Sequence, residues 1–173
     1  MKPTFNKLGL KLDTEVTKFI FKDQEIEVKR YLPVEEKLKL ISNVINLSAD
    51  ENNFANPVKL KIFLDLEILY AYTNISFTEK QKEEPAKLYD ILKSNNFFKA
   101  IFLEIPDEEL DSLVKDAHDA VAAVYAYKNS AFGIMENIVA DYKDVKLDAE
   151  EIQKTLESPT ELTLVKEIVN KLG

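Results

Sequence analysis

The chain contains no cysteine, no tryptophan and a single histidine in 173 residues. Without cysteine it can form no disulfide bond and no thiolate metal site, and it has no thiol nucleophile. The only histidine leaves the serines with one conceivable base. The signatures GxGxxG, GxxxxGK[ST], GxSxG and HExxH are also absent from the sequence. These absences predict a protein that is not an enzyme and uses no cofactor or metal.

Positive charge is also in short supply, with 23 Lys and Arg against 31 Asp and Glu, a formal net charge of −8. This balance argues against nucleic acid and membranes as main partners, because both carry negative charge and would repel the chain. The longest apolar runs are interrupted by charge, as at Asp65 and Glu67, and the first residues lack the apolar stretch of a signal peptide. Together with the lack of cysteine, these features predict a soluble protein of the cytoplasm.

Glycine occurs only three times, whereas five of the six prolines stand just before apolar residues at helical spacing. These five are Pro33, Pro57, Pro85, Pro106 and Pro159. Proline in the first turn of a helix loses no hydrogen bond, so these positions predict helix starts. The sequence therefore predicts a mainly α fold, with a helical domain and a small N-terminal β-hairpin, in a single domain over residues 1–173.

The hairpin is predicted over residues 16–29, where VTKFIF and EIEVKRYL flank the turn residues KDQ. Apolar and polar residues alternate in both segments, which indicates two antiparallel strands with one solvent-facing side. A lone hairpin is marginal in water and has to pack on helices or on another chain, and its edge is a surface for self-assembly. In residues 1–15, Leu8, Leu10 and Leu12 alternate with glycine and lysine, which fits either a short strand or a flexible arm.

The helical body is predicted over residues 33–172, with segments set by apolar spacing and by capping residues. Asn56 is expected to cap the helix that follows it, and Thr78 with Gln81 matches a capping box. Residues 57–73 also alternate like a strand, but their length, leucine content and Asn-Pro start favour a helix buried on two sides. The predicted helices are 33–47, 57–73, 85–93, 107–140 with a bend at Gly133, 148–157, and a last one from 159.

The single histidine, His118, lies between Asp116 and Asp119 within the long predicted helix. A catalytic or metal site would need a further base or ligand converging on it. Residues one or two positions apart do not share a helix face, so this cluster favours a solvent-exposed or capping histidine.

Carboxylates gather at the start of the same helix, at Glu104, Asp107, Glu108, Glu109 and Asp111. Paired carboxylates can hold a metal ion or act as acid and base in glycoside hydrolysis. Negative charge at a helix N-terminus is also stabilised by the helix dipole, and this explanation is favoured here. The later segment DYKDVKLDAEE lacks the central glycine and the ligand spacing of a calcium loop.

Apolar and aromatic residues exceed what one small core clearly needs, near residues 60–72 and in FFKAIFLEI at 97–105. Core packing is the first explanation, and a groove that receives a partner helix is the alternative. On the second explanation, the partner-binding residues are expected to be Leu60, Leu64, Tyr72, Phe97, Phe98 and Phe102.

The order of these segments resembles that of tail assembly chaperones of long-tailed bacteriophages. The likeness lies in the hairpin FIFKDQEIEVKRYLP from Phe19 to Pro33, which runs directly into an acidic helical body. It continues in ENNFANPVKLKIFLDLEILYAYTNISFTEKQ and in the final ELTLVKEIVNKLG. These segments cover most of the chain in layout.

The resemblance implies a protein that coats the helical, aggregation-prone tape measure protein in the host cytoplasm and helps to recruit tail tube subunits. It carries over no catalytic residue, and it implies release before the virion matures. A structural virion component, such as a neck, connector or decoration subunit, is the main alternative, and a small regulatory protein is a third. We also expect a homo-oligomer, because the hairpin could pair across subunits.

Overall fold

The computed structural model describes residues 2, 4–50 and 54–134. The chain divides into two units, residues 1–126 and 127–173, and each is considered by itself. Most of the second unit lies outside the described residues, so a single domain over 1–173 stays a prediction. The same holds for the helices predicted at 148–157 and from 159 on.

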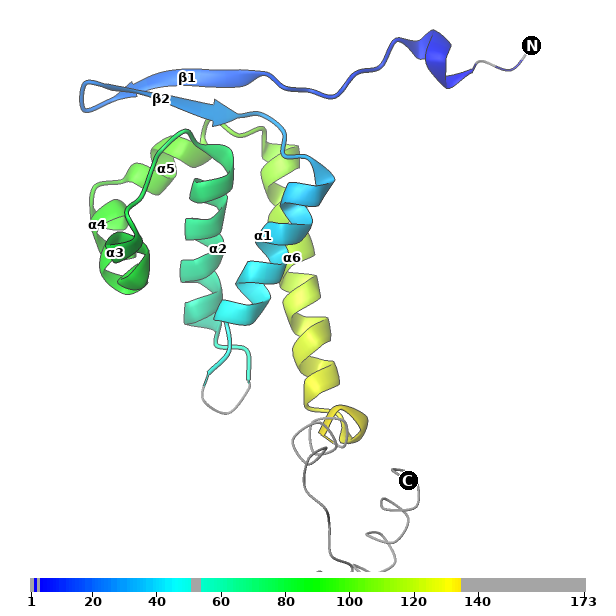
Figure 1. Ribbon diagram of the computed structural model, residues 1–173, viewed down its shortest axis with the longest axis vertical. Helices are drawn as coiled ribbons and strands as arrows, with labels where there is room; N and C mark the ends of the chain where they lie inside the picture. Colours follow the sequence, from blue (N-terminus) through cyan, green and yellow to red (C-terminus); the bar gives the residue numbers. More distant parts are fainter. Residues whose placement is uncertain (1, 3, 51–53, 135–173) are drawn as a thin grey trace, which may run out of the picture. The chain divides into compact units, whose positions relative to one another are not determined.

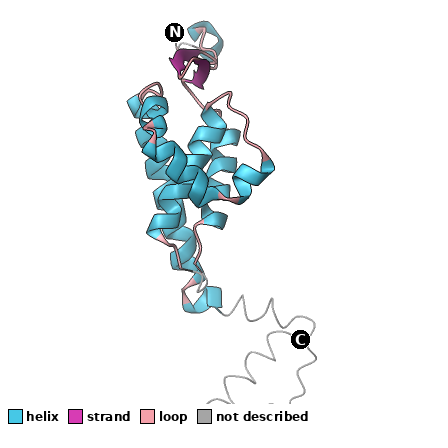
Figure 2. Ribbon diagram, turned by 90° about the vertical axis from the view of Figure 1, so that its left-hand side faces the viewer, coloured by secondary structure: helices cyan, strands magenta, loops and turns pink. Residues whose placement is uncertain are grey.

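The described part consists of a hairpin followed by helices (Figure 1). A short 3₁₀ turn at Phe5–Leu8 precedes β1 (Val16–Phe21) and β2 (Gln24–Lys29). The helices are α1 (Val34–Leu47), α2 (Pro57–Tyr72), α3 (Glu79–Glu83), α4 (Pro85–Ser94), α5 (Phe97–Phe102) and α6 (Asp107–Lys128). Figure 2 shows the hairpin as the one strand pair in this part of the chain. The predicted mainly α fold with a small N-terminal hairpin is confirmed.

The two strands of the hairpin are joined by a two-residue turn in which Lys22 and Asp23 both have positive φ, 46° and 65°. This conformation matches the twist of the flanking strands. Phe19 lies opposite Ile26, and Thr17 lies opposite Val28. These side chains share the face that turns toward the helices, where Ile26 and Val28 are buried. The hairpin therefore packs on the helical body of its own chain, as a marginal two-stranded sheet requires.

Local signals at the helix starts act as the sequence predicts. The Asn56 side chain accepts hydrogen bonds from the amides of Val58 and Lys59, at 2.9 and 3.0 Å. Thr78 and Gln81 form a complete capping box at the start of α3. Proline is the first residue of α2 and α4 and directly precedes α1 and α6. These caps satisfy amides that have no partner within a helix.

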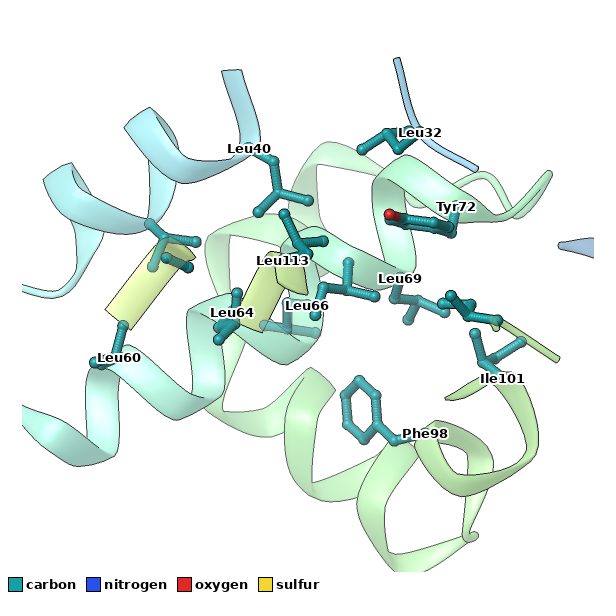
Figure 3. Close-up of a cluster of buried hydrophobic side chains, with 14 of the residues drawn as sticks. Leu32, Leu40, Leu60, Leu64, Leu66, Leu69, Tyr72, Phe98, Ile101 and Leu113 are labelled. Carbon is teal, nitrogen blue, oxygen red and sulfur yellow. The ribbon is translucent and has the colours of Figure 1, made fainter. Parts of the chain in front are cut away.

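Helix α2 lies at the centre of the hydrophobic core (Figure 3). Its buried side chains include Leu66, Leu69 and Tyr72, which contact apolar residues of several elements. Figure 3 shows Leu40 of α1, Leu113 of α6, and Phe98 and Ile101 of α5 gathered with these α2 residues. Because α2 is covered on several sides, its apolar residues follow no single stripe, and this explains why its sequence also alternates like a strand.

The long helix α6 is shorter than predicted: it ends at Lys128, not near residue 140. The Ser130 amide and hydroxyl both donate to the Tyr127 carbonyl, and Ser130 Oγ accepts from the Gly133 amide at 3.1 Å. A serine that bonds backbone groups in this way competes with helix continuation. The break therefore precedes Gly133, whose missing Cβ allows its close approach to the Tyr127 carbonyl.

Candidate partner-binding groove

An open groove of about 820 Å³ lies between α1, α2 and the segment that leads from α2 to the start of α4. Its lining includes the buried side chains of Leu40 and Leu66, which also belong to the core. The groove exists because α1 and α2 pack against each other while the chain from Ile75 to Pro85 passes beside them without filling the space. The volume is typical of sites that take a small ligand or a few side chains of a partner.

Half-buried aromatic side chains also line the groove. Phe63 and Tyr70 come from α2, and Phe77 comes from the segment after it. The rings of Tyr70 and Phe77 meet edge to face with their centroids 5.1 Å apart, which fixes the orientation of both. Leu47, at the end of α1, adds an apolar side chain that is 43% exposed. The groove wall is therefore aromatic and apolar, and part of it is exposed to solvent.

Charged residues also line the groove: Glu36, Lys39, Glu67, Lys82 and Glu83. The Asn43 amide donates to Glu67 Oε2 at 2.9 Å and so links the two helices that border the groove. Apolar walls with interspersed charge form the arrangement that an amphipathic helix needs, because its polar edges remain in contact with charged groups.

Tyr70 provides a directional group beside these apolar walls. Burial and the nearby Glu67 carboxylate raise the pKa of the Tyr70 hydroxyl above its ordinary value. Within the described residues the hydroxyl makes no hydrogen bond, and it is free to donate one to a bound chain.

Five of the six residues predicted to bind a partner lie in the core. Leu60, Leu64, Tyr72, Phe97 and Phe98 are at most 7% exposed, and Phe102 is half-buried. None of the six lines the groove. The structure thus assigns the first five to core packing, and the surface available to a partner comes from their neighbours on α2 and from the segment after it. Periodicity could not separate the two roles, because a core face and a binding face are equally apolar.

Glu109, one of the clustered carboxylates, joins three elements. Its Oε1 accepts from the Leu32 amide at 2.9 Å and from the Tyr72 hydroxyl at 2.7 Å, and its Oε2 accepts from Lys37 Nζ at 2.7 Å. Burial alone would raise the pKa of this carboxyl, but the hydrogen bonds from Lys37, Tyr72 and the Leu32 amide outweigh burial and lower it. Both oxygens are engaged within the protein, so Glu109 links α6 to α1 and α2 and is not placed to bind a ligand.

Asp65 has a comparable role within α2, where it is 7% exposed. Its Oδ2 accepts from the Tyr89 hydroxyl at 3.1 Å and lies 3.3 Å from Lys61 Nζ. Burial, followed by the charge of Asp65, raises the pKa of Tyr89 to about 12. The pair connects α2 to α4, and its only signal in the sequence is a carboxylate within an apolar run.

His118 is exposed on α6, as are Asp116 and Asp119. Within residues 4–50 and 54–134, no three histidine or carboxylate side chains converge as metal ligands. The segment DYKDVKLDAEE lies outside the described residues. None of the helices in the described ranges has the length and apolar character needed to cross a membrane.

Compared with protein-family models, curated proteins and solved structures, the chain gives no match in any of the three searches.

Proposed function

We propose that this protein is a phage tail assembly chaperone that binds and shields apolar helical segments of the tape measure protein and helps to recruit tail tube subunits. The single observation that carries the proposal is the open groove between α1 and α2, with aromatic walls and interspersed charge. The order of hairpin and helices supplies the identity of the client by resemblance.

The groove suits an amphipathic helix better than a small polar substrate. Phe63, Tyr70 and Phe77 offer apolar contact, whereas the charged lining residues match the polar flanks of such a helix. Groups that could carry out chemistry, such as Glu109 and Asp65, are already bonded within the fold. Binding without reaction is what this arrangement supports.

A single groove provides only modest affinity. Burying one leucine-sized side chain contributes about 1.5–3 kcal/mol, and two or three such anchors also have to offset the cost of association. A long client with repeated apolar faces can nevertheless be covered by many copies, each of which binds weakly and can leave. Weak, repeated binding fits a protein that coats a rod during assembly and is absent from the finished particle.

Co-expression with the tape measure protein of the same phage tests the proposal. The wild-type chain should keep the client in the soluble fraction and co-purify with it. Leu47→Lys, which places a charge among the groove's apolar residues, should weaken binding roughly 10- to 100-fold, as expected for losing one buried leucine. Leu103→Lys is the matched control, because Leu103 is a 73% exposed leucine outside the groove. Equal binding by both variants would count against the groove.

Mass spectrometry of purified virions separates the chaperone from the structural alternative. A chaperone should be absent from mature particles, whereas a neck, connector or decoration subunit should remain at fixed stoichiometry. Recovery of this chain from virions at a constant copy number would replace the chaperone proposal with the structural one.

A further inference from the structure

Among the residues that the structure describes, no backbone group pairs with the outer edge of β1. The Arg30 amide donates to the Glu15 carbonyl at 3.1 Å, which fixes the alternation of the ladder: odd-numbered β1 residues bond to β2. The N–H and C=O groups of Val16, Lys18 and Ile20 therefore point away from β2. Within the described residues, β1 pairs with β2 alone.

The opposite edge of the hairpin is protected by the protein itself. Val28 forms a bridge with Thr73, and Asn74 bonds to both backbone groups of Glu27, at 3.1 and 3.2 Å. Proteins usually cover or blunt exposed sheet edges, because these edges pair with other chains. Here the segment after α2 covers β2 and leaves β1 uncovered in the described part of the chain.

Apolar side chains accompany the free edge. Val16 and Ile20 are 43% and 75% exposed on the face of β1 that turns away from the helices. The chain from Gly9 to Glu15 forms neither helix nor strand (Figure 1), and Leu12 there is 58% exposed. An extension of β1 through this segment would place Leu12 on the same face, because side chains alternate along a strand. Lys18 lies among them, but its ammonium group is already paired with Glu25 and Glu27 of its own chain.

We propose that this edge binds the same edge of a second copy, antiparallel, with Val16 opposite Val16 of the second copy. In this register Leu12 lies opposite Ile20 of the second copy, once on each side of the two-fold axis. All three exposed apolar positions then meet apolar partners, and Lys18 meets Thr14. An isologous contact of this kind requires a self-complementary surface, which the segment from Leu12 to Ile20 provides.

Other registers fit less well. Centring the pair on Lys18 would place the two lysines directly opposite each other, which is unfavourable, and would bring Leu12 to the turn. Centring it on Thr14 would pair Leu8 with Ile20 of the second copy, but Leu8 belongs to the 3₁₀ turn and Gly9 has a φ of +64°. The register centred on Val16 keeps all its pairs between residues 12 and 20, clear of that 3₁₀ turn.

Disulfide trapping tests the register, because the natural chain contains no cysteine. The Cα atoms of directly opposed, hydrogen-bonded residues lie about 5.5 Å apart, within the range that a disulfide bridges. Val16→Cys should form a cross-linked dimer under mild oxidation. Lys18→Cys should not, since the two positions would be offset by four residues, roughly 13 Å along the strands.

A mixed experiment tests the second contact. Leu12→Cys and Ile20→Cys should each stay uncross-linked alone and form a disulfide-linked heterodimer when mixed. Cross-linking of Lys18→Cys or Ile20→Cys alone, as efficient as that of Val16→Cys, would overturn the proposed register. A full-length protein that remains monomeric by sedimentation at high concentration, with no cross-linking of Val16→Cys, would overturn the dimer.

Proline at the centre of the edge provides an independent test. Val16→Pro removes an amide that points away from β2, so no hydrogen bond between the two strands is lost. The Ile26 and Val28 amides should therefore stay protected from hydrogen exchange. The dimer should be lost, because the proline cannot donate to the second copy. A Val16→Pro protein that still dimerises would contradict the proposal. If the variant loses the hairpin, the cysteine variants decide the question. The outcome is independent of the client, because the groove uses none of these residues.

Discussion

Glu109→Gln tests whether one carboxylate fixes the start of α6 to the rest of the helical body. Glutamine keeps the size of the side chain and one carbonyl oxygen, but it removes the charge that faces Lys37 and one of the two acceptor oxygens. The ion pair is shielded from solvent, with the Lys37 and Glu109 side chains 18% and 10% exposed. The Tyr72 hydroxyl and the Leu32 amide already share Oε1, so the glutamine oxygen can keep both of their hydrogen bonds only if its NH₂ group, which is a donor, faces the Lys37 ammonium.

The expected loss of unfolding free energy is about 2–3 kcal/mol, since hydrogen bonds to charged groups contribute about 1.5–3 kcal/mol each. For a chain of this length, such a loss lowers the melting temperature by roughly 4–12 °C. Urea unfolding followed by circular dichroism measures the free energy, and an unchanged m-value shows that the change is one of stability.

Glu108→Gln is the matched control, because Glu108 is exposed and precedes Glu109 in the first turn of α6. If the acidic cluster acted only through the helix dipole, both substitutions would cost about the same, at most roughly 1 kcal/mol. Equal losses for the two variants would therefore refute the reasoning. A loss confined to Glu109 would support the specific links to Lys37, Tyr72 and Leu32.

Three further predictions follow from the same structure. The folded state lowers the pKa of Glu109, so the stability that this carboxylate contributes is present above its unfolded pKa and is lost as pH falls through its folded pKa. The difference in unfolding free energy between wild type and Glu109→Gln should therefore narrow on acidification. A difference that widened would contradict this linkage. Asn56→Ala should cost about 1 kcal/mol, because it removes the acceptor for two α2 amides, and an unchanged urea midpoint would exclude this role of the cap. Asp23→Gly should stabilise the hairpin by about 0.5 kcal/mol, because Asp23 has a φ of +65° and glycine adopts positive φ without steric cost. A lower melting temperature would show that contacts of the aspartate side chain outweigh this backbone effect.

Features set by neighbouring residues could be predicted from the sequence. The hairpin, the Asn56 cap and the capping box at Thr78 depend on side chains and backbone groups only a few positions apart. The prolines mark helix starts for the same reason, since their effect is confined to the first turn. The break after Lys128 is also local, but it depends on which of several possible hydrogen bonds Ser130 makes, and the continuing apolar spacing masked it.

Features set by distant residues could not be predicted in this way. The exposure of Tyr70 and the burial of Tyr72 differ because α1 and the segment from Ile75 to Pro85 leave a space beside one of them and not beside the other. The link from Glu109 to Tyr72 spans 37 residues of sequence. A run of carboxylates gives no indication of which member will find such a partner, because the helix dipole stabilises all of them in the same way.

The two proposed binding surfaces use different residues, and this separation has a physical consequence. The groove is built from α1, α2 and the segment after α2, whereas the dimer edge lies in residues 12–20. Leu47→Lys should therefore weaken client binding without changing Val16→Cys cross-linking. Val16→Pro should abolish pairing and leave the intrinsic affinity of one groove unchanged. A pair of linked grooves binds a client with repeated apolar faces more tightly than one groove does, because the second contact is intramolecular. Loss of the dimer should then reduce coating of a long client far more than binding of a peptide that carries a single site.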